Sequence, residues 1–472
     1  MALLSGASES QPAADLASDP ASDPASGPSP DPAPDHAAAT GRRHVVRGSM
    51  WFVISMVTGA GLSFLFWILA AKTADPTAYG IGSKLWAVVQ FLNYATTLGL
   101  PIAVAKYGSL ARRSFNTLFA WALLSTAASS LVAAVLFAAV APSFLDASNI
   151  EVLQRYGPAY CAAVVFVLIT GMAFSVLVEV RLVTLRLWRW VYARVLLVSL
   201  IRLPLLAIPA LGTNPMGLLL LIGGTPALSG FIGIVVLRRM SPREDRGSWR
   251  PLPPEWRVAV KFSLVNYAGM LLAQAPQFCI PILVDAGPTE FGPFFFAWQI
   301  STMLFLVPHI VGQVVLSESS HDAAHVDQQV RSGRRLSLAL MVGATVVIVL
   351  ATPVLIPRFL GPDYQLTADL LPILSAASIP WAITAIYLAR ARVEANHIRT
   401  AAITLGFAVL TLVPTALMSR HTGPTGASQA WLLGNVAAAG WAAAVTRWVR
   451  PTAARPRAPL SPAAVTGTAA PG

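Results

Sequence analysis

Residues 47–107 read RGSMWFVISMVTGAGLSFLFWILAAKTADPTAYGIGSKLWAVVQFLNYATTLGLPIAVAKY and contain two long apolar runs, at about 48–71 and 84–105. A short polar segment, KTADPTAYGIGS, separates these runs. Each run can cross the hydrocarbon core of a bilayer, because a transmembrane helix needs about 20 residues at a rise of about 1.5 Å per residue. Basic residues flank the stretch, Arg47 at its start and Lys106 near its end. The stretch therefore predicts a membrane hairpin whose two ends lie on the same side.

The composition extends this theme to the whole chain. The 472 residues are 55% hydrophobic and only 11% charged, whereas a soluble domain has about 25% charged residues. This composition favours an all-α polytopic membrane protein, because too few polar residues are available to cover several soluble cores. About 12 transmembrane helices are predicted, at about residues 48–71, 84–105, 115–140, 158–180, 194–211, 216–237, 258–284, 292–315, 336–356, 367–389, 400–418 and 427–446.

The basic residues predict the orientation of these spans. The chain has 33 Lys and Arg against 21 Asp and Glu, a formal net charge of +12. Most of the basic residues fall in alternate loops, such as the one that holds Arg334 and Arg335. Because cytoplasmic loops carry the excess of Lys and Arg, both termini are expected in the cytoplasm, with an even number of spans. Topology thus accounts for the positive charge, and no nucleic-acid partner is expected.

The longest basic connection, residues 238–257, divides the predicted spans into six and six. The second half echoes the first, with Phe291-Gly292 in the place of Tyr79-Gly80 between its first two spans. The halves are expected to be related by an axis along the membrane normal. The predicted division is a disordered Pro/Ala/Ser/Asp-rich cytoplasmic tail at 1–40, a six-helix lobe at 41–237, a basic cytoplasmic linker at 238–257, a second six-helix lobe at 258–450 and a disordered tail at 451–472.

Charged residues inside spans are costly and are therefore candidates for a binding site. Arg202 lies about eight residues into its span, a depth of about 12 Å. It is interpreted as an inward-facing cation, and the alternative is that its long side chain reaches the cytoplasmic interface. Lys84 begins the second span and Lys261 the seventh. Each is a candidate substrate contact, although a role as an interfacial anchor is the simpler interpretation.

Uncharged polar residues gather in the first two spans of each half. As a group they could line a hydrophilic cavity between the halves, whereas a single such residue more often bonds one helix to another. The candidates are Gln90, Asn93, Asn266, Gln274, Gln277, Gln299 and His309.

Enzymes and metal proteins are disfavoured. The loops predicted outside the membrane are short, and the glycine pattern of a Walker A loop precedes no lysine. The His321-Asp322-Ala323-Ala324-His325 segment is interpreted as part of a solvated loop helix. No metal, cofactor or catalytic residue is therefore expected. A proton- or sodium-coupled drug exporter would need a buried carboxylate, and none lies clearly at mid-span.

Several motifs resemble one family. Arg47-Gly48-Ser49 precedes the first span, Asp75-Pro76-Thr77-Ala78-Tyr79-Gly80 forms the hinge, and the second span ends LGLPIAVAKY at Leu98–Tyr107. The stretches Phe291–Glu318 and Phe359–Tyr364 are similar as well. This pattern, over about residues 42–450, resembles the polysaccharide (oligosaccharidyl-lipid) flippases of the multidrug/oligosaccharidyl-lipid/polysaccharide exporter (MOP) superfamily.

The resemblance implies two six-helix lobes, alternating access and export of a polyprenyl-pyrophosphate-linked oligosaccharide across the bacterial inner (plasma) membrane. Better-known members use cations in the central cavity, for which Lys84, Arg202 and Lys261 are the candidates here. The expected partners are the lipid-linked oligosaccharide, membrane lipids and a polysaccharide polymerase or glycosyltransferases. The alternatives are an exporter of a small or amphiphilic molecule, similar to the MATE proteins of the same superfamily, and a non-transporting scaffold of a polysaccharide assembly complex.

Overall fold

The computed structural model describes residues 34–108, 115–155, 157–240, 255–321, 326–394 and 396–449. Met1–Met50 and Trp51–Gly472 form two separate units, and the first contributes only the start of one helix to the described residues. That helix, α1 (Pro34–Thr73), begins inside the segment predicted to be disordered. A proline at its start and the Ala-rich run after it favour helix, which explains the earlier start. The rest of the predicted tails, and most of the 238–257 linker, lie outside the described residues.

All regular structure in the described ranges is helical. After α1 the helices are α2 (Pro76–Thr96), α3 (Leu100–Gly108), α4 (Phe115–Val140), α5 (Ala147–Gln154), α6 (Pro158–Thr184), α7 (Trp188–Leu205), α8 (Pro209–Gly212), α9 (Pro215–Leu219), a π-helical turn (Leu220–Gly224), α10 (Thr225–Met240), α11 (Glu255–Leu283), α12 (Pro288–His321), α13 (Val326–Leu360), α14 (Gln365–Ala376), α15 (Ser378–Val393) and α16 (His397–Trp448).

The twelve predicted spans all fall on these helices, but some spans are broken. The second is split between α2 and α3 because Leu98 and Gly99 have φ values of 49° and 67°, which a right-handed helix does not allow. α16 holds the last two spans, which meet at a kink where Gly423 has a φ of 57°. Glycine adopts this left-handed conformation at little cost, so the chain can reverse without a longer loop.

Length and composition identify the chain as a multi-pass membrane protein. Within the described residues, seven helical stretches are long and apolar enough to cross a membrane, and Val57–Thr73 and Tyr267–Leu283 are shorter apolar helices. Large apolar side chains point outward on the outer faces of the bundle, as Leu350 does on α13, where 72% of it is exposed. An aqueous surface would disfavour such a belt, whereas a bilayer accepts it.

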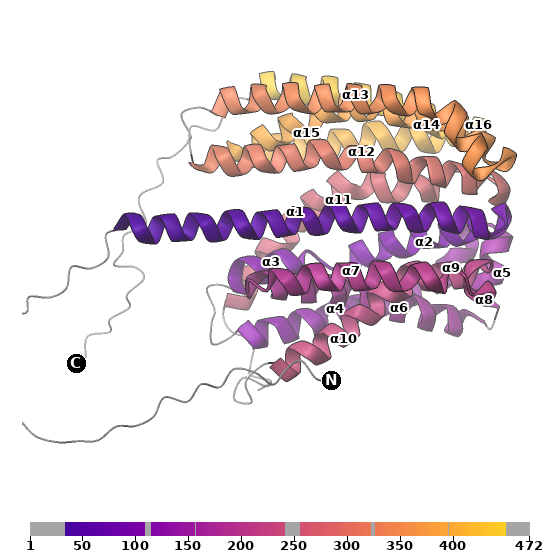
Figure 1. Ribbon diagram of the computed structural model, residues 1–472, viewed down its shortest axis with the longest axis horizontal. Helices are drawn as coiled ribbons and strands as arrows, with labels where there is room; N and C mark the ends of the chain where they lie inside the picture. Colours follow the sequence, from indigo (N-terminus) through magenta and orange to yellow (C-terminus); the bar gives the residue numbers. More distant parts are fainter. Residues whose placement is uncertain are drawn as a thin grey trace, which may run out of the picture. The chain divides into compact units, whose positions relative to one another are not determined.

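The helices after Met50 pack as two sets, which we call the N-half (residues 51–240) and the C-half (residues 255–449). Within the N-half, α6 contacts α2, α4 and α10, and within the C-half, α12 contacts α13, α14 and α15. The two sets meet where α2 contacts α11 and α12. The turn between α1 and α2, the short helices α5 and α8, and the kink of α16 gather at one end of the bundle (Figure 1). We call this the hinge end, and the opposite end, where described arginines such as Arg186 lie between α6 and α7, the basic end.

Candidate functional site

The two halves touch most closely at the hinge end, through the starts of α2 and α12. Asp75 caps α2 by accepting a hydrogen bond from the Thr77 backbone N–H at 3.0 Å. One turn later, Gly80 lies so close to the C-half that a Cβ at this position would be 1.8 Å from the carbonyl oxygen of Pro288. Gly292 faces this contact from α12, and its Cβ would be 3.4 Å from the Gly80 nitrogen. The residues that echo each other in the sequence are thus in contact.

Aromatic side chains fill the space around this glycine contact. Tyr79 is completely buried, with its ring 5.9 Å from that of Trp67 on α1 and 6.2 Å from that of Tyr364 before α14. The Tyr364 hydroxyl donates to the Ala71 carbonyl oxygen at 3.2 Å. The hinge end is therefore closed by buried aromatic packing that includes side chains of both halves.

Lys84 joins the halves at this end. Its side chain is almost fully buried, and its Nζ lies 2.9 Å from Asp146 Oδ2 of the N-half. The same atom lies 3.5 Å from the Val284 carbonyl oxygen and 5.4 Å from the ring centroid of Phe291, both in the C-half. The structure therefore places this candidate substrate contact in the closure, and Lys84 does not line the central cavities described below.

The ion pair leads to a prediction about stability. We expect Asp146→Asn to lower the Tm of the purified protein more than Lys84→Met does. Asn leaves a buried ammonium without a charged partner, whereas Met leaves a carboxylate that is 41% exposed and can be hydrated. Thermal unfolding of both variants in the same detergent provides the measurement, and the double variant, which should recover toward Lys84→Met, is the control. An equal or smaller loss of Tm for Asp146→Asn would contradict this interpretation.

Arg202 lies between α7 and α1. Its Nη2 donates to Ser63 Oγ at 2.6 Å, and its guanidinium carbon is 5.2 Å from the ring centroid of Phe66. It is 92% buried, so it does not simply extend to the interface, yet it lines neither central cavity. Hydropathy predicted its depth in the span but could not predict the direction in which it leaves the helix.

Three further candidates add little to the site. The backbone of Lys261 and Asn266 lies in α11, and their side chains are outside the described part of the structure. Asn93 is on α2, and its Oδ1 is buried without a hydrogen-bond partner in the described chain. Asn93 lines neither central cavity.

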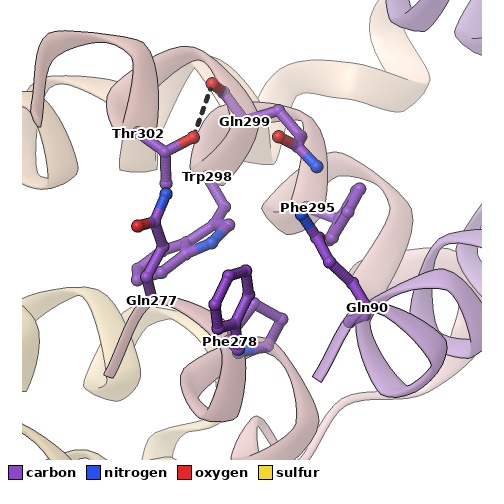
Figure 2. A pocket seen from close by; sticks show the side chains of 9 residues that line it. Gln90, Gln277, Phe278, Phe295, Trp298, Gln299 and Thr302 are labelled. Carbon is purple, nitrogen blue, oxygen red and sulfur yellow. Dashed lines mark hydrogen bonds between the residues drawn. The ribbon is translucent and has the colours of Figure 1, made fainter. Parts of the chain in front are cut away.

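A small pocket of about 30 Å³ lies where the halves meet, and we call it the inter-half pocket. Gln90 enters it from α2, Gln277 from α11, and Gln299 from α12, and the rings of Phe278, Phe295 and Trp298 complete the wall. Figure 2 shows Gln90 reaching toward Gln299, with Phe278 and Trp298 lying between Gln90 and Gln277 in this view. The Thr302 hydroxyl donates to the Gln299 carbonyl oxygen at 2.9 Å.

A second cavity, of about 100 Å³, lies inside the C-half and shares Gln277 and Thr302 with the inter-half pocket. We call it the C-half cavity. Gln274 and His309, both predicted from the sequence, line it. Its other lining residues are Ala273, Phe305, Leu306, Trp381, Phe407 and Trp431.

The glutamine side chains of the two cavities are available to a ligand. Those of Gln90, Gln274, Gln277 and Gln299 form no hydrogen bond with any other residue of the described chain. Each amide has N–H donors and an acceptor oxygen. Leaving these groups without hydrogen bonds in a dry site would be unfavourable. None of the described residues form a group of three or more His, Cys, Asp or Glu that could hold a metal ion. The cavities are thus neutral, polar and aromatic.

Toward the basic end, a tyrosine joins the halves again. The Tyr267 hydroxyl on α11 donates to the Ala95 carbonyl oxygen on α2 at 2.6 Å. The ring of Tyr94 lies 5.1 Å from that of Phe278, which also lines the inter-half pocket. Arg392 on α15 is half-buried and within electrostatic reach of Tyr94 and His309. Its guanidinium forms no ion pair or hydrogen bond with another residue of the described chain.

Sequence reasoning missed most of the aromatic wall and Arg392. Trp381 lies well inside its predicted span, away from the interfaces where tryptophan usually gathers, and this position was the available signal. Trp298 and Trp431 lie close to the predicted starts at 292 and 427 and had no such signal. Arg392 follows the predicted span at 367–389, so the sequence favours a cytoplasmic loop position for it. α15 continues to Val393, so this arginine is on a helix that faces the cavities.

Three solved structures have similar folds. The lipid II flippase MurJ in an inward closed conformation matches with a TM-score of 0.62 and 13% identity, over 84% of this chain and 87% of that chain. An inward-facing multidrug resistance MATE family transporter of the MOP superfamily matches with a TM-score of 0.59 and 14% identity, over 85% and 100%. A MOP superfamily transporter from Pyrococcus furiosus matches with a TM-score of 0.55 and 15% identity, over 84% and 93%.

No family model and no curated protein sequence matches the chain. At such low identity the structural likeness establishes the fold. The chain has the all-α fold of MOP superfamily transporters, with two six-helix lobes, as the sequence predicted. Its place in the polysaccharide flippase family stays a prediction.

Proposed function

We propose that this protein is an alternating-access transporter that moves a polyprenyl-pyrophosphate-linked oligosaccharide across the bacterial inner membrane for the synthesis of a cell-surface polysaccharide. The main support is the polar, aromatic inter-half pocket, which a glycine contact closes at the hinge end. A site between two bodies that touch at one end can be exposed to either side of the membrane when the bodies rock. The MOP fold supports the same conclusion.

The cargo would be divided between protein and lipid. Sugar and pyrophosphate are costly in hydrocarbon and would occupy the cavity, whereas the polyprenyl tail would remain in the bilayer. The inter-half pocket and the C-half cavity, at about 30 and 100 Å³, hold only a few water molecules. The structure therefore corresponds to a contracted state, and binding of a glycan requires the halves to separate at the basic end.

The basic end would face the cytoplasm, with both termini on that side. The sequence supports this orientation, because its arginine-rich connections alternate between spans and cytoplasmic loops carry the positive charge. Substrate would then enter from the cytoplasmic leaflet, where lipid-linked intermediates are assembled by glycosyltransferases, and leave toward a polymerase outside. An inside-negative potential favours the outward movement of an anion by about 2.3 kcal/mol per charge per 100 mV. The proposed moving bodies are the lobes 41–237 and 258–450, joined by the 238–257 linker.

Arg392 is the proposed contact for the pyrophosphate. A guanidinium binds phosphate oxygens through paired hydrogen bonds, and this one is not engaged by another residue of the described chain. It is within electrostatic range of Tyr94 and His309, and His309 lines the C-half cavity, which supports this role. Lys84 and Arg202, which the sequence suggested, are already held by Asp146 and Ser63.

A deletion strain tests the proposed function in cells. Without the protein, we expect lipid-linked oligosaccharide to accumulate in the cytoplasmic leaflet while surface polysaccharide is lost. The measurement is the fraction of lipid-linked glycan that an impermeant periplasmic glycosidase can cleave. A normal cleaved fraction, together with export of a small amphiphile lost in the same strain, would favour the small-molecule exporter. Restoration of polysaccharide by a variant with its cavities blocked would favour the scaffold.

A further inference from the structure

The C-half cavity is walled by an aromatic cage that the proposed function leaves unexplained. The ring of Trp381 lies 4.7 Å from that of Phe407, and the ring of Phe305 lies 5.3 Å from that of Trp431. The Phe305 and Trp381 rings are 5.9 Å apart, so the four rings form a nearly continuous wall. All lining residues of this cavity come from α11, α12, α15 and α16, so the cage belongs to the C-half alone.

Polar groups without partners border the cage. Trp431 is only 2% exposed, and its indole N–H is buried without an acceptor in the described chain. Gln274 and Gln277 also lack hydrogen-bond partners there. By contrast, the indole N–H of Trp381 donates to the Phe305 carbonyl oxygen at 3.2 Å, so this side chain is held in place. The cavity thus combines a fixed apolar wall with unused donors and acceptors.

The lack of charged residues among those that line the C-half cavity restricts the kind of ligand that it can bind. No Asp, Glu, Lys or Arg is among the residues that line the C-half cavity. An organic cation would be attracted by the rings, but it would find no carboxylate among the lining residues, and the positive charge of Arg392 acts on His309 in this wall. A pure hydrocarbon would leave Gln274 and Gln277 without partners. A neutral ring with apolar faces and hydroxyl edges satisfies both the aromatic and the amide groups.

The size of the cavity indicates a single ring. An apolar protein cavity of about 150 Å³ accommodates benzene, a six-membered ring. The C-half cavity has about 100 Å³ and adjoins the inter-half pocket through Gln277 and Thr302. Separation of the halves would enlarge the inter-half pocket and open the C-half cavity toward it across this shared wall. One ring could then enter the C-half cavity, with the rest of a glycan extending into the inter-half pocket.

We propose that the C-half cavity binds one neutral pyranose ring of the cargo, with an apolar face of the sugar against the aromatic cage and its hydroxyls on Gln274 and Gln277. This inference rests on the proposed function, because it names the part of the cargo that this protein recognises. The cage would select the sugar, whereas Arg392 would hold the phosphate common to all such lipids.

Direct binding tests this proposal without any transport. The full-length protein in lipid nanodiscs is mixed with methyl β-D-glucopyranoside or methyl 2-acetamido-2-deoxy-β-D-glucopyranoside at millimolar concentration, and saturation-transfer NMR reports contact. We expect binding of at least one glycoside, and an affinity about tenfold lower in Gln277→Leu, which loses one buried hydrogen-bonding group. Trp190→Phe is the matched control, because Trp190 is 58% exposed on α7. The absence of binding to the wild type, or equal binding in Gln277→Leu, would overturn the proposal.

A second variant distinguishes the loss of a ligand contact from a folding defect. Gln277→Glu keeps the shape of the side chain but adds the missing carboxylate. We expect it to lose glycoside binding and to gain binding of tetraphenylphosphonium, an organic cation that the wild type should bind more weakly than the glycosides. If the wild type prefers tetraphenylphosphonium, the neutral-sugar assignment is wrong. Transport of lipid-linked oligosaccharide by a wild type that binds no glycoside would refute this inference alone, whereas glycoside binding without such transport would refute the proposed function.

Discussion

Gly80→Ala is expected to reduce transport to the background level, because the added methyl group cannot fit when the hinge end is closed. The Cβ would lie 1.8 Å from the Pro288 carbonyl oxygen and 2.8 Å from the Pro288 carbonyl carbon, so backbone on both sides would have to move. The closed hinge end is the state in which the basic end can open. A protein that cannot close it would remain open on the outer side and could not load substrate from the cytoplasm.

Spin labels can measure this change. Ser143 of the N-half and Arg420 of the C-half are both exposed and serve as cysteine sites, after removal of the native Cys161 and Cys279. In Gly80→Ala we expect the distance distribution between the two labels to shift toward longer values.

The control for Gly80→Ala is Gly343→Ala, where a Cβ would meet nothing within 4 Å. Gly292→Ala should have an intermediate effect, because its Cβ would lie 3.1 Å from the Pro76 carbonyl oxygen and from the Tyr79 ring. If Gly80→Ala transports normally and its distances do not change, the glycine contact is not a gate.

Arg392→Gln is expected to raise the KM for a polyprenyl-pyrophosphate-linked glycan by at least about tenfold. Hydrogen bonds to charged groups contribute about 1.5–3 kcal/mol, which corresponds to about 10- to 150-fold in affinity. The wild type should also prefer a pyrophosphate-linked glycan to the monophosphate-linked form of the same glycan, and the variant should lose most of this preference. Initial rates of transport in proteoliposomes, measured with both lipids, provide the test.

Two control variants separate charge from position in this experiment. Arg392→Lys keeps the charge and should retain part of the preference, although it loses the paired hydrogen bonds. Arg334→Gln removes an exposed arginine on α13, also near the basic end, and should change neither KM nor preference. An equal rise in KM for Arg334→Gln would attribute the effect to the general surface charge and not to the cavity.

The sequence predicted the helices and the partnership of the two halves better than it predicted the site. Apolar runs of about 20 residues are a strong signal, and each of them is mainly helical in the structure, although breaks at residues 97–99 and 206–208 interrupt two of them. The echo between Tyr79-Gly80 and Phe291-Gly292 also had a physical basis, since these glycines let the starts of α2 and α12 approach. The four glutamines found in the cavities were all among the polar residues that the sequence singled out.

The sequence could not predict the direction in which a side chain leaves its helix, and this was the main limit on predicting the site. A span that is apolar on all faces has no periodicity to show which face is lipid-exposed, so the depth of Lys84 and Arg202 was apparent but their neighbours were not. Lys84 bonds to Asp146, a contact between residues 62 positions apart. Arg202 bonds to Ser63, 139 positions away. For the same reason the cage residues Phe407 and Trp431 could not be distinguished from lipid-facing aromatic residues, and Trp381 was marked only by its depth in the span.

Transport by the purified protein tests the central claim most directly. The full chain is reconstituted into liposomes that carry a polyprenyl-pyrophosphate-linked oligosaccharide, and an impermeant glycosidase measures how fast the glycan changes leaflet. We predict rapid transfer with the wild type, transfer at the protein-free rate with Gly80→Ala, and a normal rate with Gly343→Ala. Transfer by the wild type at the protein-free rate, in vesicles where the protein is folded and correctly inserted, would contradict the account.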